Sequence, residues 1–109
     1  MAEPVSIDEF QRLDLRVGRV VRAEPLEGSK KLVKVTVSLG EGERTLVAGI
    51  REHYPPEGLP GKSVIVVANL KPARIFGVES RGMLLAAEGG GKLALLAPDR
   101  EMEPGSRIR

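Results

Sequence analysis

Apolar and polar residues alternate most regularly between positions 33 and 39. Valine or leucine occupies every odd position, whereas Lys34, Thr36 and Ser38 occupy the even ones. A period of two predicts a β-strand with one buried face, so we expect these three polar side chains on the outer face. Gly40-Glu41-Gly42-Glu43 follows. Such a glycine-rich segment predicts a hairpin turn into a further strand over 44–48.

A weaker alternation, at residues 12–17, predicts an earlier strand. The alternation slips at Gly18-Arg19, because Val20 and Val21 are both apolar. A glycine at such a slip predicts a β-bulge, which small barrels use to bend a strand around a corner.

Two short helices are expected beside these strands. Ser6 and Glu9 have the spacing of a capping box, which predicts a helix over 7–11. A second short helix is expected over 49–54, ended by the two prolines that follow.

The remaining segments complete a small all-β domain. Apolar runs at 63–68, 83–87 and 92–97 predict strands, and residues 98–109 form a polar tail with a turn at Pro104-Gly105. About five core strands, the first of them bulged, match the oligonucleotide/oligosaccharide-binding (OB) barrel, with a short N-terminal helix and a C-terminal extension. A chain of 109 residues supports one such core, so we expect a single domain over 1–109.

Composition narrows the classes of function. The chain has no cysteine, which excludes disulfides and thiolate metal sites. Its first residues lack the basic start and apolar core of a secretory signal, and its apolar runs are too short to cross a bilayer. We therefore expect a cytoplasmic protein without a membrane partner.

The sequence offers little catalytic chemistry. His53 is the only histidine, and no serine has the context of a nucleophile elbow. Gly61-Lys62-Ser63 is similar to the end of a phosphate-binding loop, but Pro56 stands where that motif requires glycine, and a strand follows. No carboxylates are spaced for a metal site. The chain is therefore predicted not to be an enzyme and to need no metal or cofactor.

Basic residues are the positive signal. The net charge is only +2, but seven basic residues stand against three acids between Arg12 and Lys34, which predicts one face of positive potential. The candidate phosphate ligands lie in the first loop, on the strand at 33–39 and around the strand at 83–87. They are Lys30, Lys31, Lys34, Lys71, Arg74 and Arg81.

The chain has too few aromatic residues for a general single-strand coat. Binders of single strands stack bases on several rings, whereas only Phe10, Tyr54 and Phe76 are present. Recognition of a folded RNA by shape and phosphate geometry fits better. The sequence leaves two places open for Phe76, the core or an exposed position where it stacks on a base.

Four motifs, taken together, resemble the tRNA-binding domain family. They are Asp-Leu-Arg-Val-Gly-Arg-Val at 14–20, Lys-Leu-Val-Lys-Val at 31–35, Asn-Leu-Lys-Pro at 69–72 and Ser-Arg-Gly-Met-Leu-Leu-Ala-Ala at 80–87. The family includes stand-alone bacterial tRNA-binding proteins, the C-terminal domain of methionyl-tRNA synthetase and the endothelial-monocyte-activating polypeptide II domain. The resemblance covers residues 7–108.

The resemblance implies an OB barrel, commonly a homodimer, that binds the outer corner or body of tRNA independently of the anticodon. It works alone or as an aid to methionyl-tRNA synthetase. By position, the resemblance implies tRNA-contacting or site-shaping roles for Lys31, Asn69, Lys71, Arg74, Ser80 and Met83. The Ser80 hydroxyl would face backbone or ribose, and Met83 would shape the floor of the site. With the basic candidates, the predicted site is Lys30, Lys31, Lys34, Asn69, Lys71, Arg74, Ser80, Arg81 and Met83.

The chain departs from the family at one loop. Where the family commonly reads His-Pro-x-Ala-Asp-Lys-Leu, this chain has Leu-Glu-Gly-Ser-Lys-Lys-Leu at 26–32, which makes the loop more basic. A sister group with a protein-export chaperone role shares the fold and the opening motif. The alternative function is therefore a peptide-binding module, which would require an exposed apolar groove. Residues 80–83 are more similar to the tRNA-binding branch.

Overall fold

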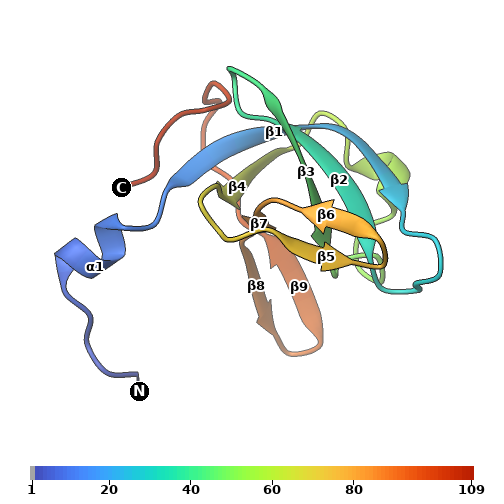
Figure 1. The fold of residues 1–109 in the computed structure, drawn as a ribbon, viewed down its shortest axis with the longest axis horizontal. Coiled ribbons are helices and arrows are strands. Elements are labelled where there is room, and N and C mark those ends of the chain that lie inside the picture. Colours follow the sequence, from blue (N-terminus) through green and yellow to red (C-terminus); the bar gives the residue numbers. More distant parts are fainter. Residues whose placement is uncertain (1) are drawn as a thin grey trace.

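The computed structural model describes residues 2–109, and its main element is a nearly closed antiparallel sheet of five strands (Figure 1). The strands are β1 (Leu15–Pro25), β2 (Val33–Ser38), β3 (Glu43–Ala48), β4 (Ser63–Val67) and β7 (Met83–Leu84). Their order in the sheet is β3-β2-β1-β4-β7. This arrangement confirms the predicted all-β, five-stranded barrel.

Strand β1 bends so that it can serve two partners. Its first half, Leu15 to Arg19, pairs with β4, and its second half, Arg19 to Pro25, pairs with β2. The register with β2 shifts between Val20 and Arg22, which leaves Val21 as the extra residue of a bulge. The predicted bulge therefore exists, but at Val21 and not at Gly18-Arg19.

Gly18 has a different role from the one predicted. It is buried, and a Cβ on it would come within 3.0 Å of a methyl group of Val66 on β4. The absence of a side chain thus lets β1 and β4 pack closely.

The core lies inside the barrel and is aliphatic. Val33, Val35 and Val37 are completely buried, as the alternation predicted. Thr36 lies on the outer face of the strand, as expected. It is nevertheless buried, because only 4% of it is accessible to solvent. Its cross-strand partners, Arg22 and Thr45, flank it on both sides, and neighbours on the same face of a sheet are close enough to screen a short side chain.

The first predicted helix is confirmed. Helix α1 (Ile7–Gln11) begins at the expected capping box, in which the Glu9 N–H donates to Ser6 Oγ and the Ser6 N–H donates to Glu9 Oε1, both at 3.1 Å. The helix stands away from the barrel (Figure 1) and buries none of its residues.

The predicted helix over 49–54 was wrong. The chain there makes a single turn, in which the Tyr54 N–H donates to Ile50 O at 2.9 Å. A short 3-10 helix, η1 (Pro56–Gly58), follows, with Pro56 as its first residue. Proline suits the first turn of a helix because its φ is already fixed there, so this proline begins a helix instead of ending one.

The expected strand over 83–87 is divided at Leu85. Its N–H donates to Ile65 O in the barrel, while its carbonyl accepts from Leu96, both at 3.0 Å. Beyond Leu85 the chain leaves the barrel as the hairpin of β8 (Ala86–Gly89) and β9 (Lys92–Leu95), which projects below the barrel in Figure 1.

The C-terminal tail returns to β1 along the edge that β2 leaves free. The Val17 N–H donates to Ser106 O at 2.8 Å, and the Ile108 N–H donates to Leu15 O at 2.9 Å. Residues 106–108 are therefore held beside β1 by backbone pairing.

A second small hairpin was not predicted. Strands β5 (Ala73–Ile75) and β6 (Val78–Ser80) are joined by Phe76 and Gly77, whose φ angles are +49° and +80°. Two positive φ angles are what a type I′ turn requires. For a phenylalanine, the left-handed region costs about 1 kcal/mol.

Gly82 should be sensitive to substitution because it lies where β3 and β4 converge. Its φ is +150°, and a Cβ would come within 3.1 Å of both Leu46 Cδ2 and Val67 O. We expect Gly82→Ala to lower the free energy of unfolding by about 2 kcal/mol in urea titrations. Gly42→Ala is the control, since no atom lies within 4 Å of its Cβ position. Equal stability of the two variants would contradict this assignment.

Candidate nucleic-acid interface

Most of the predicted site residues lie on one excursion of the chain, between β4 and β7. This excursion, residues 68–82, carries the β5–β6 hairpin across the front of the barrel in the view of Figure 1. Met83 follows it directly as the first residue of β7. Within the hairpin, Ala73 and Ile75 pair with Ser80 and Val78 and face the barrel, whereas Arg74 pairs with Glu79 on the outer side.

Strand β6 is fixed to the edge strand β3 by two hydrogen bonds. The Arg81 N–H donates to Thr45 O at 3.0 Å, and the Val47 N–H donates to Ser80 Oγ at 3.0 Å. The Ser80 hydroxyl, which is buried, donates in turn to Gly82 O at 3.4 Å. Ser80 therefore takes the place of a backbone acceptor at the edge of β3, and its hydroxyl is engaged within the fold.

Asn69 is likewise engaged within the protein. Its Oδ1 accepts from the Asp14 N–H at 2.8 Å, and its Nδ2 donates to Arg12 O at 2.7 Å. This amide ties the chain leaving β4 to the segment that leads from α1 into β1.

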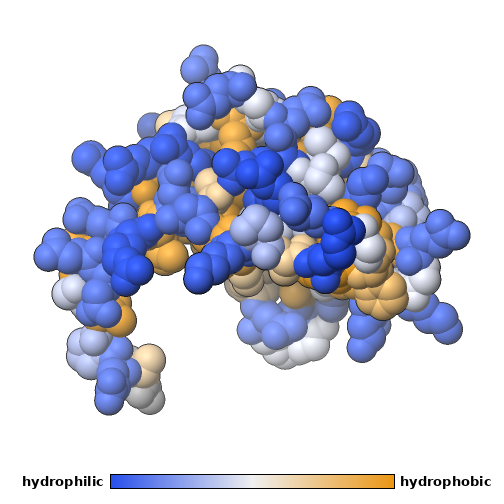
Figure 2. Space-filling view, viewed as in Figure 1, coloured by the Kyte–Doolittle hydropathy of each residue, from blue (hydrophilic) through white to orange (hydrophobic). Residues whose placement is uncertain are grey.

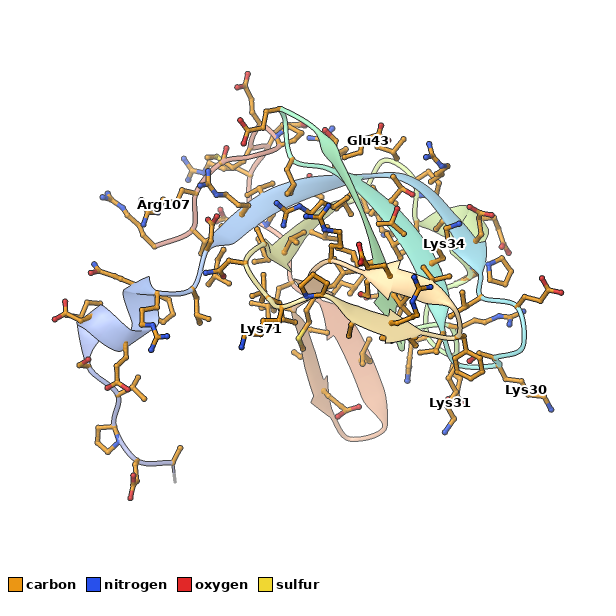
Figure 3. The ribbon with its side chains drawn as sticks, viewed as in Figure 1. Lys30, Lys31, Lys34, Glu43, Lys71 and Arg107 are labelled. Atoms are coloured by element: carbon orange, nitrogen blue, oxygen red, sulfur yellow. The ribbon has the colours of Figure 1, made fainter. Side chains whose placement is uncertain are left out.

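Except for Lys34, which is half-buried on β2, the cations of the predicted site are exposed and lie along the hairpin and beside its tip. Lys71 lies at one end of the β5–β6 hairpin, and Lys30 and Lys31 lie beside the other end (Figure 3). Arg74 lies between these ends and donates from Nη1 to Gly77 O at 2.8 Å, so its guanidinium is held across the turn. The structure thus brings cations from two segments, 26–32 and 69–83, to one side of the barrel.

Acidic residues interrupt this cationic surface. Glu79 is the cross-strand partner of Arg74, and its carboxylate lies 3.9 Å from Arg81 Nε. Lys34 lies on the outer face of β2, opposite Glu24 on β1. Across segments 26–32 and 69–83 there are five cations and two carboxylates, so the surface is positive without being uniformly so.

An apolar groove of about 520 Å³ lies beneath the hairpin. Lys71, Ser80 and Met83 of the predicted site line it, and the Met83 side chain is exposed. The rest of the lining is mostly apolar and includes Leu32, Ile50, Leu70, Ala73, Ile75 and Leu84. Sequence reasoning missed the groove. The available signal was the alternation of Ala73 and Ile75 with Arg74, which indicates a strand with an inner apolar face.

Outside the hairpin, the first half of β1 carries a tight ion pair. Arg16 Nε lies 2.6 Å from Asp14 Oδ1. The hydrogen bond that Arg16 donates to Asp14, together with the negative charge of Asp14, raises the pKa of Arg16 above its usual value.

Two further features concern a membrane span and a metal site. No helix within 2–109 is long and apolar enough to cross a membrane. Over the same residues, no three side chains of His, Asp or Glu gather where they could hold a metal ion.

The family model for a putative tRNA binding domain matches residues 15–107, nearly the whole chain. This chain belongs to the tRNA-binding domain family. The match includes the barrel, the hairpin excursion and the loop that carries Lys30 and Lys31, and it confirms the resemblance found in the sequence.

Individual relatives of this tRNA-binding domain agree with the match. The methionine–tRNA ligase of Archaeoglobus fulgidus is 56% identical over 106 residues, which are 97% of this chain but 16% of the ligase. The chain thus spans about a sixth of the ligases it matches. The crystal structure of a MetRS related protein from Pyrococcus horikoshii superimposes with a TM-score of 0.93 at 44% identity, covering 99% of this chain and 100% of that one.

A second branch shares the fold. The crystal structure of chaperone CsaA from Bacillus anthracis has a TM-score of 0.89 and 30% identity, covering 98% of this chain and 100% of that chain. The OB-like barrel of the tRNA-binding domain is therefore shared by proteins with different names and roles.

Asn69→Ala tests whether this side chain stabilises the tRNA-binding domain. The variant loses hydrogen bonds to Asp14 and Arg12, so we expect a loss of about 1 kcal/mol in the free energy of unfolding. Faster hydrogen exchange at the Asp14 amide should accompany it. Lys71→Ala is the control, because this exposed side chain lies on the same excursion. Unchanged stability and unchanged exchange in Asn69→Ala would show that the Asn69 side chain does not stabilise the domain, and would contradict this assignment.

Proposed function

We propose that this domain binds folded tRNA without catalysing a reaction, through the face formed by segments 26–32 and 69–83. The observation that carries the proposal is the β5–β6 hairpin with cations along it and beside its tip, in a chain that belongs to the tRNA-binding domain family. The methionine–tRNA ligases that it matches support the same ligand.

The geometry suits contacts to phosphates. Lys71, Lys30 and Lys31 supply mobile point charges at the two ends of the hairpin, and Arg74 supplies a guanidinium held in place by Gly77 O. One bond to that carbonyl leaves other N–H groups of Arg74 free for a phosphate. Arg81 and Lys34 add charge at the periphery, beside Glu79 and Glu24.

The remaining predicted residues shape the face. Asn69 and Ser80 hold the excursion on the barrel through bonds to backbone groups. Met83 lines the groove together with Lys71. In this proposal, recognition depends on the spacing of phosphates in folded tRNA and not on anticodon sequence.

Two settings suit such a domain. In one it is part of, or an aid to, a methionyl-tRNA synthetase in the cytoplasm and raises the affinity of that enzyme for tRNA. In the other it acts alone as a homodimer. The chain spans about a sixth of those ligases, and this proposal assigns none of their catalytic steps to it.

The exposed apolar side of α1 supports the dimer. Val5, Ile7, Phe10 and Leu13 are all exposed, and Val5, Phe10 and Leu13 line a hollow of about 460 Å³ that Leu70 completes. Contiguous exposed apolar surface of this kind marks contact sites. A second copy of the chain is the proposed occupant.

A peptide-binding role is the second candidate. The apolar groove beneath the hairpin and the fold shared with chaperone CsaA favour it. The two functions differ in their salt dependence, since burial of apolar surface releases few counterions whereas phosphate contacts release many.

Filter binding of bulk tRNA at several salt concentrations tests the main proposal. With about four to six phosphate contacts, the logarithm of affinity should fall against the logarithm of salt concentration with a slope of about −3 to −5. Lys71→Ala/Arg74→Ala should weaken all tRNAs about tenfold and make the slope shallower by about two. The control is Arg100→Ala/Arg109→Ala, which removes the same charge from the C-terminal tail.

Either of two results would count against the proposal. If the two double variants bind tRNA equally, the site lies on another face. If tRNA binding is flat with salt while unfolded polypeptide binds tightly, the peptide-binding role is favoured.

Light scattering tests the proposed dimer. Phe10→Glu places a charge on the apolar side of α1, so the mass at micromolar concentration should fall from two copies to one. Val21→Glu is a matched control, because Val21 is 39% exposed and Phe10 is 38% exposed. A wild-type mass of one copy would exclude the dimer at that concentration.

A further inference from the structure

Phe76 is the most exposed aromatic ring among the described residues. It is 61% accessible and occupies the tip of the β5–β6 hairpin. The turn holds its backbone at a φ of +49°, in the left-handed region that residues with bulky side chains rarely adopt.

Neither the backbone nor the core accounts for a phenylalanine at this position. Type I′ turns favour asparagine or glycine at the first central residue, and an exposed ring gains little from burial. The core cluster is built from aliphatic residues, most of them in the five-stranded sheet, and does not include Phe76. The sequence therefore places an apolar ring where folding alone favours a small polar residue.

One edge of the ring lies close to the loop 26–32. A Cβ on Gly28 would come within 3.6 Å of Phe76 Cδ1 and 3.8 Å of Cε1, so one edge of the ring rests on the loop 26–32. Figure 2 shows an apolar patch where the hairpin tip meets this loop, next to strongly hydrophilic side chains. The ring is held at one edge, and much of it stays open to solvent.

Cations lie on both segments that meet at the hairpin tip. Lys30 and Lys31 lie beside the hairpin tip (Figure 3), and the guanidinium of Arg74 is fixed to Gly77 O at 2.8 Å. Glu27 in the loop and Glu79 on β6 are the acids of the same segments. An apolar plane between phosphate-binding groups matches a nucleotide, whose base is a flat apolar surface attached to an anion.

We propose that Phe76 stacks on one unpaired nucleobase of the bound RNA, while Lys30, Lys31 and Arg74 bind the phosphates on either side. The inference rests on the proposed tRNA binding and adds a ligand class to it. Folded RNAs expose unstacked bases in their loops, and aromatic rings recognise them there. A single ring suits one such base, which agrees with the shortage of aromatic residues elsewhere.

Phe76→Asn separates stacking from packing. Asparagine relaxes the turn, so thermal unfolding should occur at the same or a higher temperature than in the wild type. The Kd for tRNA should rise about tenfold. The salt slope should stay unchanged, because no charge is removed. A fully paired RNA duplex offers no free base, so its affinity should be the same for both proteins.

Phe76→Trp gives a direct optical test, because the chain contains no tryptophan. The indole should retain tRNA affinity, and its fluorescence should be quenched by tRNA but not by the duplex. Met102→Trp is the control, since Met102 is an exposed apolar residue of the C-terminal tail. Its fluorescence should not respond to tRNA.

The outcomes distinguish this inference from the function it rests on. Wild-type protein that fails to bind tRNA would overturn both. If the wild type binds tRNA tightly and the Kd of Phe76→Asn is within twofold of the wild-type Kd, the stacking alone is overturned. The stacking is also overturned if Phe76→Asn loses as much affinity for the duplex as for tRNA, or if tRNA does not quench the fluorescence of Phe76→Trp. A lowered unfolding temperature with unchanged Kd would assign the ring to packing against Gly28.

Discussion

The pairing of strand β1 with two partners is the constraint on which the rest of the structure depends. Its first half lies beside β4 and its second half beside β2, and the bulge at Val21 allows the change of direction. The C-terminal tail pairs with the edge of the first half that β2 does not reach. Because β1 is bent in this way, the outer strands β3 and β7 come close together, and the sheet nearly closes into a barrel.

The place where the barrel closes is also the place of the candidate interface. Three hydrogen bonds join β3 to the excursion 68–82. They run from Arg44 Nη1 to Ala68 O, from the Arg81 N–H to Thr45 O, and from the Val47 N–H to Ser80 Oγ. The same excursion carries Lys71 and Arg74 on its solvent side. Residues that close the barrel and residues that face the proposed RNA therefore alternate along one short segment. A substitution in this segment can weaken RNA binding either by loosening the fold or by removing a contact to the RNA.

The sequence predicts those elements that local rules determine. The alternation of apolar and polar residues predicted the strand at 33–38, the capping box predicted α1, and the four motifs together predicted the family. Tertiary context decided the rest. Neighbouring strands bury Thr36. Leu85 divides an apolar run between the barrel strand β7 and the β8–β9 hairpin, and the β5–β6 hairpin depends on an unusual turn at Phe76. The cationic segments were predictable, but the groove and the engagement of Ser80 within the fold were not, because both arise from contacts distant in sequence.

The most direct test of the central claim is a map of the tRNA footprint on the isotope-labelled protein, by amide chemical shifts during a tRNA titration. The account predicts that the largest changes fall in segments 26–32 and 69–83, with little change in the C-terminal tail or in the outer face of β1. Largest changes in the tail, with the β5–β6 hairpin unaffected, would contradict it.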